Sequence, residues 1–318
     1  KGAKRMIKPK HRYFVFFMVL TLVFSFLGNN FVAYAYDKNY EMHLVPISHI
    51  DTAWMWPYVD VAQNVIPDTW YKQIGYLKNN PELRFTISAI QHLAWSKEYY
   101  PDMWEDIREL YAEGRIEIVG GQLVEPDTNT PSGESHVRQF LIGQKFLEEN
   151  FGKKTTVGFL PDCFGFSGQY PQIMKKSGID YFVTAKLTWN DTNKFPYNLF
   201  FWKGIDGSSV LSYLTTKNYD HVYSDSEIKE VLDALKPYGV NRGYGSFGAG
   251  DHGGGPSLAN YEQVLNQDKD PSNPHVILSS ATRYFDSVSK DDLSKVPTWE
   301  GEMYLEYHRG TYTSWARQ

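Results

Sequence analysis

The segment Met42-His43-Leu44-Val45-Pro46-Ile47-Ser48-His49-Ile50-Asp51-Thr52-Ala53-Trp54 decides how the rest of the chain is interpreted. Its apolar first half, residues 42–48, predicts a short buried strand. His49 and Asp51 stand two residues apart at the end of that strand, so they are expected to point to the same side. Together they supply half of a four-ligand site for a divalent metal ion, with Trp54 as an apolar wall. The alternative is a histidine hydrogen-bonded to an aspartate that caps the next helix.

Strand-like and helix-like segments alternate along most of the chain. After the first strand, further strands are predicted at residues 84–88, 116–120, 157–160, 181–184, 210–214, 243–247 and 276–279. The helical segments include residues 95–113, 133–150 and 224–235. This alternation predicts a parallel sheet covered by crossover helices, either closed as a barrel or left open. Ligands of such folds bind at the carboxyl ends of the strands.

Titratable residues follow the predicted strands, as this rule requires for a functional site. They are His49 and Asp51 after the first strand, Glu125 and Asp127 after the third, Asp162 after the fourth, Lys186 after the fifth, and Asp251 with His252 after the seventh.

The N-terminal 35 residues have a composition of their own. Basic residues between Lys4 and Arg12 precede an apolar run at residues 13–27, and Ala33-Tyr34-Ala35 follows. This pattern predicts a secretory signal peptide in residues 1–35, and therefore a secreted or extracytoplasmic protein. An uncleaved signal would anchor the protein to the membrane, and that alternative stays open. Residues 36–318 are interpreted as the folded part of the chain.

Composition restricts the classes of partner. The 318 residues are 42% hydrophobic and 16% aromatic, enough for a large core. Without the six basic residues of the predicted signal, 26 basic and 37 acidic side chains remain, a net charge of −11. Such an acidic body is a poor candidate for binding nucleic acid. The single cysteine, Cys163, excludes an internal disulfide, which favours a large-cored bacterial enzyme over a small disulfide-stapled module.

Two loops offer further chemistry. Asp162 comes directly after a predicted strand among aromatic residues, where a buried carboxylate is costly unless a cation meets it. A metal shared with His49 and Asp51 is one such cation, and capping of a helix near Ser167 is the alternative. The segment Gly248–Pro256 lacks the ending of a phosphate-binding loop. Its glycines either display Asp251 at the rim of a pocket or form a flexible exposed turn.

The chain resembles the catalytic barrel of glycoside hydrolase family 38, the metal-dependent α-mannosidases. Five motifs carry this resemblance in the order of the family: His49-Ile50-Asp51-Thr52-Ala53-Trp54, the run from Gly120 to Glu134, Leu160-Pro161-Asp162-Cys163-Phe164-Gly165-Phe166, Gly250-Asp251-His252-Gly253-Gly254-Gly255-Pro256, and His308-Arg309-Gly310-Thr311-Tyr312-Thr313. It implies a distorted parallel β/α barrel of about seven strands. The family's later helical and β domains, and the histidine that is its fourth metal ligand, are expected beyond Gln318.

The resemblance also implies roles for single residues. The zinc ligands would be His49, Asp51 and Asp162, with Asp162 also the catalytic nucleophile. Trp54 would be the platform for the sugar, and Lys186 a basic group near the nucleophile. Asp251 would be the acid/base residue, with His252 able to share in substrate binding or proton transfer. Because the ligands include more carboxylate than imidazole, Ca²⁺, Mn²⁺ and Co²⁺ stay open beside Zn²⁺.

The implied activity is hydrolysis of terminal α-linked mannose from glycans with retention of the anomeric configuration. Two other classes stay open on the sequence alone. One is a metal-dependent hydrolase that activates water, as deacetylases do, because a His-X-Asp pair at a strand end serves that chemistry as well. The other is an inactive carbohydrate-binding fragment.

Overall fold

The computed structural model describes residue 36, residues 38–304, and residues 306 and 307. The predicted signal peptide and the motif at His308 lie outside this part of the chain. In order, the elements are β1 (Glu41–Ser48), α2 (Tyr58–Asp60), the π-helical η1 (Val61–Val65), α3 (Ile66–Asn79), β2 (Phe85–Ile87), α4 (Ile90–Tyr99), α5 (Pro101–Ala112), β3 (Ile116–Ile118), α6 (Gly133–Phe151), β4 (Val157–Phe159), α7 (Tyr170–Lys176), β5 (Tyr181–Thr184), the 3-10 turn η2 (Lys186–Thr188), β6 (Leu199–Lys203), β7 (Ser209–Leu214), α8 (Asp225–Leu235), the 3-10 turn η3 (Lys236–Tyr238), β8 (Arg242–Ala249), α9 (Leu258–Lys269), β9 (His275–Leu278), α10 (Ala281–Val288) and β10 (Thr298–Glu300).

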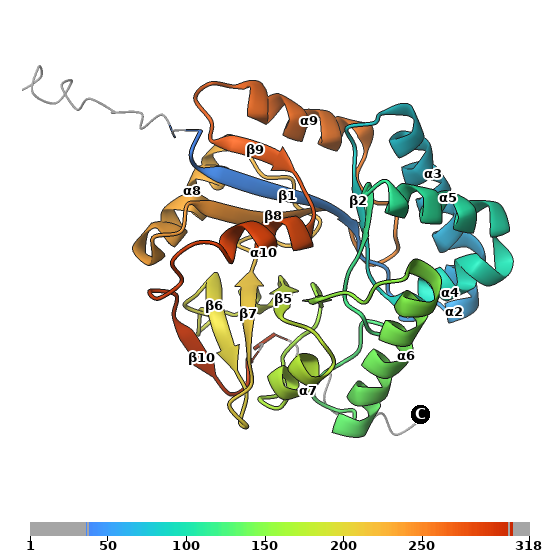
Figure 1. Ribbon diagram of the computed structural model, residues 1–318, viewed down its shortest axis with the longest axis horizontal. Coiled ribbons are helices and arrows are strands. Elements are labelled where there is room, and N and C mark those ends of the chain that lie inside the picture. The colour runs from blue at the N-terminus through green and yellow to red at the C-terminus, as the bar shows by residue number, and fades with distance from the viewer. Residues whose placement is uncertain (1–35, 37, 305, 308–318) are drawn as a thin grey trace, which may run out of the picture. The chain divides into compact units, whose positions relative to one another are not determined.

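The strands form two five-stranded sheets (Figure 1). In the first, the order is β3-β2-β1-β8, and β9 also pairs with the first half of β1; every pairing is parallel. In the second, the order is β10-β6-β7-β5-β4, with β4, β5 and β7 parallel and β6 antiparallel to β7. All eight predicted strands are present, and the parallel β/α architecture is confirmed.

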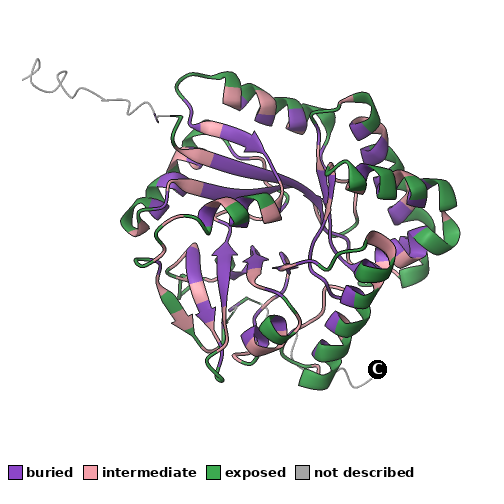
Figure 2. Ribbon diagram, in the orientation of Figure 1, coloured by how far each residue is buried: buried purple, intermediate pink, exposed green. Residues whose placement is uncertain are grey.

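The two sheets enclose a shared core, which gives the fold its distorted barrel character. One buried cluster takes Val45 and Ile47 from β1, Phe159 from β4, Tyr213 from β7 and Tyr244 from β8. At one seam between the sheets, the N–H group of residue 120 donates to the carbonyl oxygen of residue 157 at 2.8 Å. Figure 2 shows the strands of the barrel largely buried and the helices exposed on their outer sides. Among the described residues, no helix combines the length and apolar composition that crossing a membrane requires.

Helix boundaries follow local chemistry. Ser132 caps α6 by accepting a hydrogen bond from the backbone N–H of Ser135, and Gly152 ends that helix in a left-handed conformation. The predicted helical segment at residues 95–113 is helical but interrupted. The segment forms α4 and α5, separated at Tyr100, because the residue before Pro101 is forced out of the helical region.

The hairpin of β6 and β7 was not predicted, although Asp206-Gly207 between two apolar runs is a turn signal.

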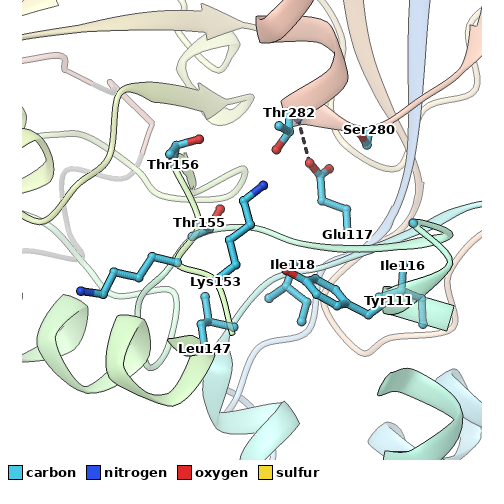
Figure 3. Close-up of a pocket in the computed structure, with 12 residues that line it drawn as sticks. Tyr111, Ile116, Glu117, Ile118, Leu147, Lys153, Thr155, Thr156, Ser280 and Thr282 are labelled. Carbon is cyan, nitrogen blue, oxygen red and sulfur yellow. Dashed lines mark hydrogen bonds between the residues drawn. The ribbon is translucent and has the colours of Figure 1, made fainter. Parts of the chain in front are cut away.

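A cavity of about 270 Å³ opens beside the start of β3 and the loop before β4 (Figure 3). On one wall, Glu117 accepts hydrogen bonds from the backbone N–H groups of Ala281 and Thr282 at 2.7 and 2.8 Å, in the first turn of α10. Burial raises the pKa of Glu117 even though these donors favour its ionised form. None of the predicted site residues lines this cavity, so it is separate from the predicted site.

Candidate active site

Continued pairing of β1 and β8 brings two predicted loops face to face. The strands pair in register up to Ser48 opposite Ala249. Beyond that point the N–H of His49 donates to the carbonyl of Ala249 at 3.0 Å, and the N–H of Asp51 donates to that of Asp251 at 2.9 Å. The close approach requires glycine at position 248, since a Cβ there would lie 1.8 Å from the carbonyl oxygen of residue 47.

His49 is buried at the centre of a group of carboxylates. Its Nε2 lies 3.3 Å from Oδ1 of Asp51 and 4.0 Å from Oδ2 of Asp162. Its Nδ1 lies 2.9 Å from Oε2 of Glu125, whose other oxygen accepts a hydrogen bond from the Ser88 hydroxyl at 2.5 Å. Burial opposes the charged imidazolium, but the carboxylates of Glu125 and Asp51 outweigh it and raise the pKa of His49 well above its usual value. The site therefore attracts positive charge.

Asp162 is held by a cation and a hydroxyl. The Lys186 ammonium donates to its Oδ1 at 2.5 Å, and the Tyr219 hydroxyl lies 3.0 Å from the same oxygen. Lys186 is itself buried, and its ammonium lies 4.0 Å from the ring centre of Trp189. The backbone N–H of Lys186 donates to the carbonyl of Pro161 at 2.9 Å, so the loops after β4 and β5 are tied together. Lys186 thus lies where the sequence predicted a basic group.

Tyr219 joins the two predicted catalytic carboxylates. Its hydroxyl lies 2.8 Å from Oδ1 of Asp251 as well as 3.0 Å from Asp162. Burial raises the pKa of Tyr219, and the two carboxylates raise it further, so the phenol keeps its proton. The hydroxyl has one proton, so it donates to one carboxylate at a time. Its oxygen can accept a hydrogen bond from the other carboxyl group when that group is protonated. The hydroxyl therefore couples the two carboxyl groups.

Asp251 has a strained backbone. Its φ is +61°, in the left-handed region that residues with a Cβ rarely adopt. The loop is nevertheless fixed, because α3 holds it from behind. Thr69 accepts a hydrogen bond from the N–H of Gly254, and Gln73 donates to the carbonyl oxygens of Gly254 and Pro256. These hydrogen bonds favour the display of Asp251 over the alternative of a flexible turn.

The site fits a divalent cation. Donor atoms of His49, Asp162 and Asp251 all lie within 4.8 Å of one another, whereas the sequence prediction grouped Asp51 with the first two. Nε2 of His49 is buried and makes no well-aligned hydrogen bond among the described residues, although Oδ1 of Asp51 lies 3.3 Å away. Glu125 behind Nδ1 resembles the carboxylates that orient metal-binding histidines. Nitrogen and carboxylate donors of this kind suit Zn²⁺ and also other divalent ions.

Trp54 and His252 lie at the outer side of the site. Trp54 is 60% exposed and meets Trp56 edge-on, with ring centres 5.5 Å apart, so one indole face is available to a ligand. His252 packs against Trp56 with ring centres 4.0 Å apart, and its Nε2 lies 3.1 Å from a carboxylate oxygen of Asp60. His252 therefore links the glycine-rich loop to the loop that carries Trp54.

Sequence reasoning missed Tyr219 and gave Glu125 no role. Tyr219 lies five residues beyond the end of β7, in a loop without a recognisable motif. The rule that functional side chains follow the strands is the only signal that points toward it.

Known proteins are similar to this chain over most of its length. Residues 39–302 match the N-terminal domain of glycosyl hydrolases family 38. Alpha-mannosidase G of Dictyostelium discoideum is 41% identical over 272 residues, which cover 84% of this chain and 25% of that protein. Human alpha-mannosidase 2C1 is 39% identical over 288 residues, which cover 88% of this chain and 27% of that protein.

A solved structure, that of an alpha-mannosidase from Enterococcus faecalis, superposes with a TM-score of 0.69 at 21% identity. The superposition covers 83% of this chain and 31% of that protein, and at this identity it shows the fold alone. The chain spans about a quarter of the length of the curated relatives it matches. The match over residues 39–302 shows that the chain belongs to glycosyl hydrolase family 38 and contains its N-terminal domain.

Proposed function

We propose that the protein hydrolyses terminal α-linked mannose from glycans and retains the anomeric configuration. The observation that carries this proposal is the pair of carboxylates, Asp162 and Asp251, with oxygens within 4.8 Å of each other and both in contact with Tyr219. Retaining glycosidases need carboxyl groups about 5–5.5 Å apart, whereas inverting enzymes need roughly 6.5–9.5 Å to admit a water molecule. The observed spacing supports retention.

In the first step, Asp162 attacks the anomeric carbon and forms a glycosyl ester while the bond to the departing oxygen breaks. Asp251 gives that oxygen its proton. In the second step Asp251 takes a proton from water, which attacks the same carbon and releases mannose and the Asp162 carboxylate. Lys186 and Tyr219 both contact Oδ1 of Asp162 and fix the orientation of its carboxylate.

A metal ion would be held by His49 and Asp162, with Asp51 as a further carboxylate ligand, because Asp251 must carry the proton that it donates. When bound, it would supply electrostatic support and a grip on neighbouring sugar hydroxyls. We infer Zn²⁺ from the family resemblance. Glu125 fixes the ring of His49 from behind, so that Nε2 faces the site.

The substrate class follows from the relatives and from the exposed ring. The relatives named above are alpha-mannosidases, which supports a mannose-containing oligosaccharide or glycan as the partner. The apolar face of a sugar stacks on aromatic rings, and Trp54 offers such a face beside the site. Secretion remains a prediction from the N-terminal sequence.

The proposal is tested by assaying the full-length protein on an aryl α-mannoside before and after removal of metal with a chelator. We expect hydrolysis to disappear with the metal and to return when Zn²⁺ is added back. The initial product, followed by NMR, should be α-mannose. Hydrolysis of an acetylated sugar without hydrolysis of the mannoside would instead identify a water-activating deacetylase.

A further inference from the structure

A carboxylate from the last described segment is enclosed by the loop that follows β5. Glu306 is 4% exposed. One of its oxygens accepts hydrogen bonds from the backbone N–H groups of Asp191 and Thr192 at 2.8 and 2.7 Å. The other accepts from the N–H and the side-chain amide of Asn193 at 2.9 and 2.7 Å. Three consecutive N–H groups that converge on one anion form a backbone nest, which here is filled by the protein's own side chain.

The contact is reciprocal, because Glu306 and its neighbours also bond to the loop through their backbone. The N–H of Glu306 donates to the side-chain oxygen of Asn190 at 2.6 Å, and the side-chain amide of Asn190 lies 3.4 Å from the carbonyl of Tyr304. The hydrogen bonds from residues 191–193 lower the pKa of Glu306 to about 2, so the carboxylate is ionised at neutral pH. Charge-assisted bonds of this kind are stronger than neutral ones.

The loop that encloses Glu306 also carries Lys186, which contacts the proposed nucleophile, Asp162. Its first turn, η2, begins with Lys186, whose ammonium donates to Asp162 at 2.5 Å. That ammonium also lies over the ring of Trp189, the residue before the anchored stretch. The start of the turn is fixed to Pro161 by backbone hydrogen bonds, while the stretch after Trp189 is fixed by Glu306. Lys186 and Trp189 therefore lie between two anchors.

We propose that Glu306 is a positioning residue for the active site: its carboxylate fixes the loop at residues 190–193, which holds Trp189 against Lys186 and Lys186 against Asp162. This inference rests on the proposed function. It predicts that loosening the loop lets the ammonium move away from Asp162, with loss of the cation that orients the nucleophile. Displacement of catalytic groups by about 1 Å is enough to slow an enzyme substantially.

The variant Glu306→Gln is the sharpest change. Each oxygen of the Glu306 carboxylate accepts two hydrogen bonds. In Glu306→Gln an NH₂ group replaces one of these oxygens. In either orientation of the glutamine amide, that NH₂ group faces two donors and cannot accept from them. Glu306→Asp keeps the charge. Glu302→Gln makes the same chemical change at an exposed position of the same segment, where the side chain has no partner in the described part of the chain.

Two measurements on the full-length protein test the proposal. Hydrogen exchange followed by mass spectrometry reports on the amides of residues 191–193 without reference to activity, and we expect them to lose protection in Glu306→Gln and to keep it in Glu302→Gln. In the mannoside assay, we expect kcat/KM to fall at least tenfold in Glu306→Gln, mainly through kcat, with partial recovery in Glu306→Asp.

A double-mutant cycle with Lys186→Ala separates positioning from a merely structural contribution. If Glu306 acts through Lys186, Glu306→Gln should lower kcat/KM only slightly in a protein that already carries Lys186→Ala. The losses of the two single variants would then not be additive. Unchanged amide protection, activity equal to that of Glu302→Gln, or additive losses would each overturn the proposal. An inactive wild-type protein would instead refute the proposed function, and the exchange experiment would still decide whether Glu306 fixes the loop.

Discussion

Removal of a single hydroxyl group, by the variant Tyr219→Phe, tests the shared carboxylate site. The ring of Tyr219 is buried and packs against His49 with ring centres 5.0 Å apart, so phenylalanine keeps the packing. What is lost is the hydroxyl that lies 2.8 Å from Asp251 and 3.0 Å from Asp162.

The size of the effect follows from the charge of the partners. A hydrogen bond to a charged group contributes about 1.5–3 kcal/mol. One hydroxyl proton makes one such bond at a time, so kcat/KM should fall roughly 10- to 150-fold, taking about 1.4 kcal/mol for each factor of ten. The fold should be nearly unchanged, because the substitution leaves the apolar contacts in place.

Two aryl α-mannosides that differ in leaving group locate the effect. A dinitrophenolate departs without a proton, whereas a poor leaving group needs the proton of Asp251. If Tyr219 acts on Asp251, the loss should be larger for the poor leaving group; equal losses would place its action at Asp162. Activity of Tyr219→Phe within twofold of wild type on both substrates would refute the inference that the hydroxyl couples the carboxylates.

Three further predictions concern the metal site, the barrel and pH. Glu125→Gln should weaken metal binding about 10- to 100-fold in a titration of the metal-free protein; unchanged affinity would show that Glu125 does not orient His49. Gly143→Ala should lower the free energy of unfolding by about 1–3 kcal/mol, because its Cβ would lie 2.3 Å from a backbone oxygen, whereas Gly75→Ala, with open space around it, should not destabilise. The pKa of Glu117 is raised in the folded state, so the folded protein binds this proton more tightly than the unfolded chain does. The free energy of unfolding of wild type, relative to that of Glu117→Gln, should therefore fall as pH rises above about 4.3. A difference between the two proteins that does not change with pH would contradict this.

Most of the parallel strands could be predicted from the sequence because they are short runs rich in apolar residues. Buried on both faces, such strands lack the alternation of exposed ones and are recognised by length and by the polar residues that follow them. The same rule placed His49, Asp162 and Asp251 together, since their strands end at one side of the barrel. His49 and Asp251 are 202 residues apart in sequence, and they meet because β1 pairs with β8.

Other features depend on geometry that no local pattern encodes. The contact of Tyr219 with two carboxylates requires the course of the loop after β7, and the enclosure of Glu306 requires the backbone of residues 191–193 to curl around it. Which carboxylate joins His49 and Asp162 also depends on angles at the loop ends, where Asp251 adopts a left-handed backbone. Spacing along the chain carries none of this information.

The central claim is that Asp162 is the nucleophile. It lies beside His49, in a site whose carboxylates attract a cation, and opposite Asp251, the acid. The claim is tested most directly by incubating the active full-length protein with an activated fluoromannoside, which forms a slowly hydrolysed glycosyl-enzyme, and by mapping the labelled peptide with mass spectrometry. The account predicts one fluoromannosyl group, on Asp162. A label on any other side chain, or turnover of the reagent without any covalent intermediate, would contradict it.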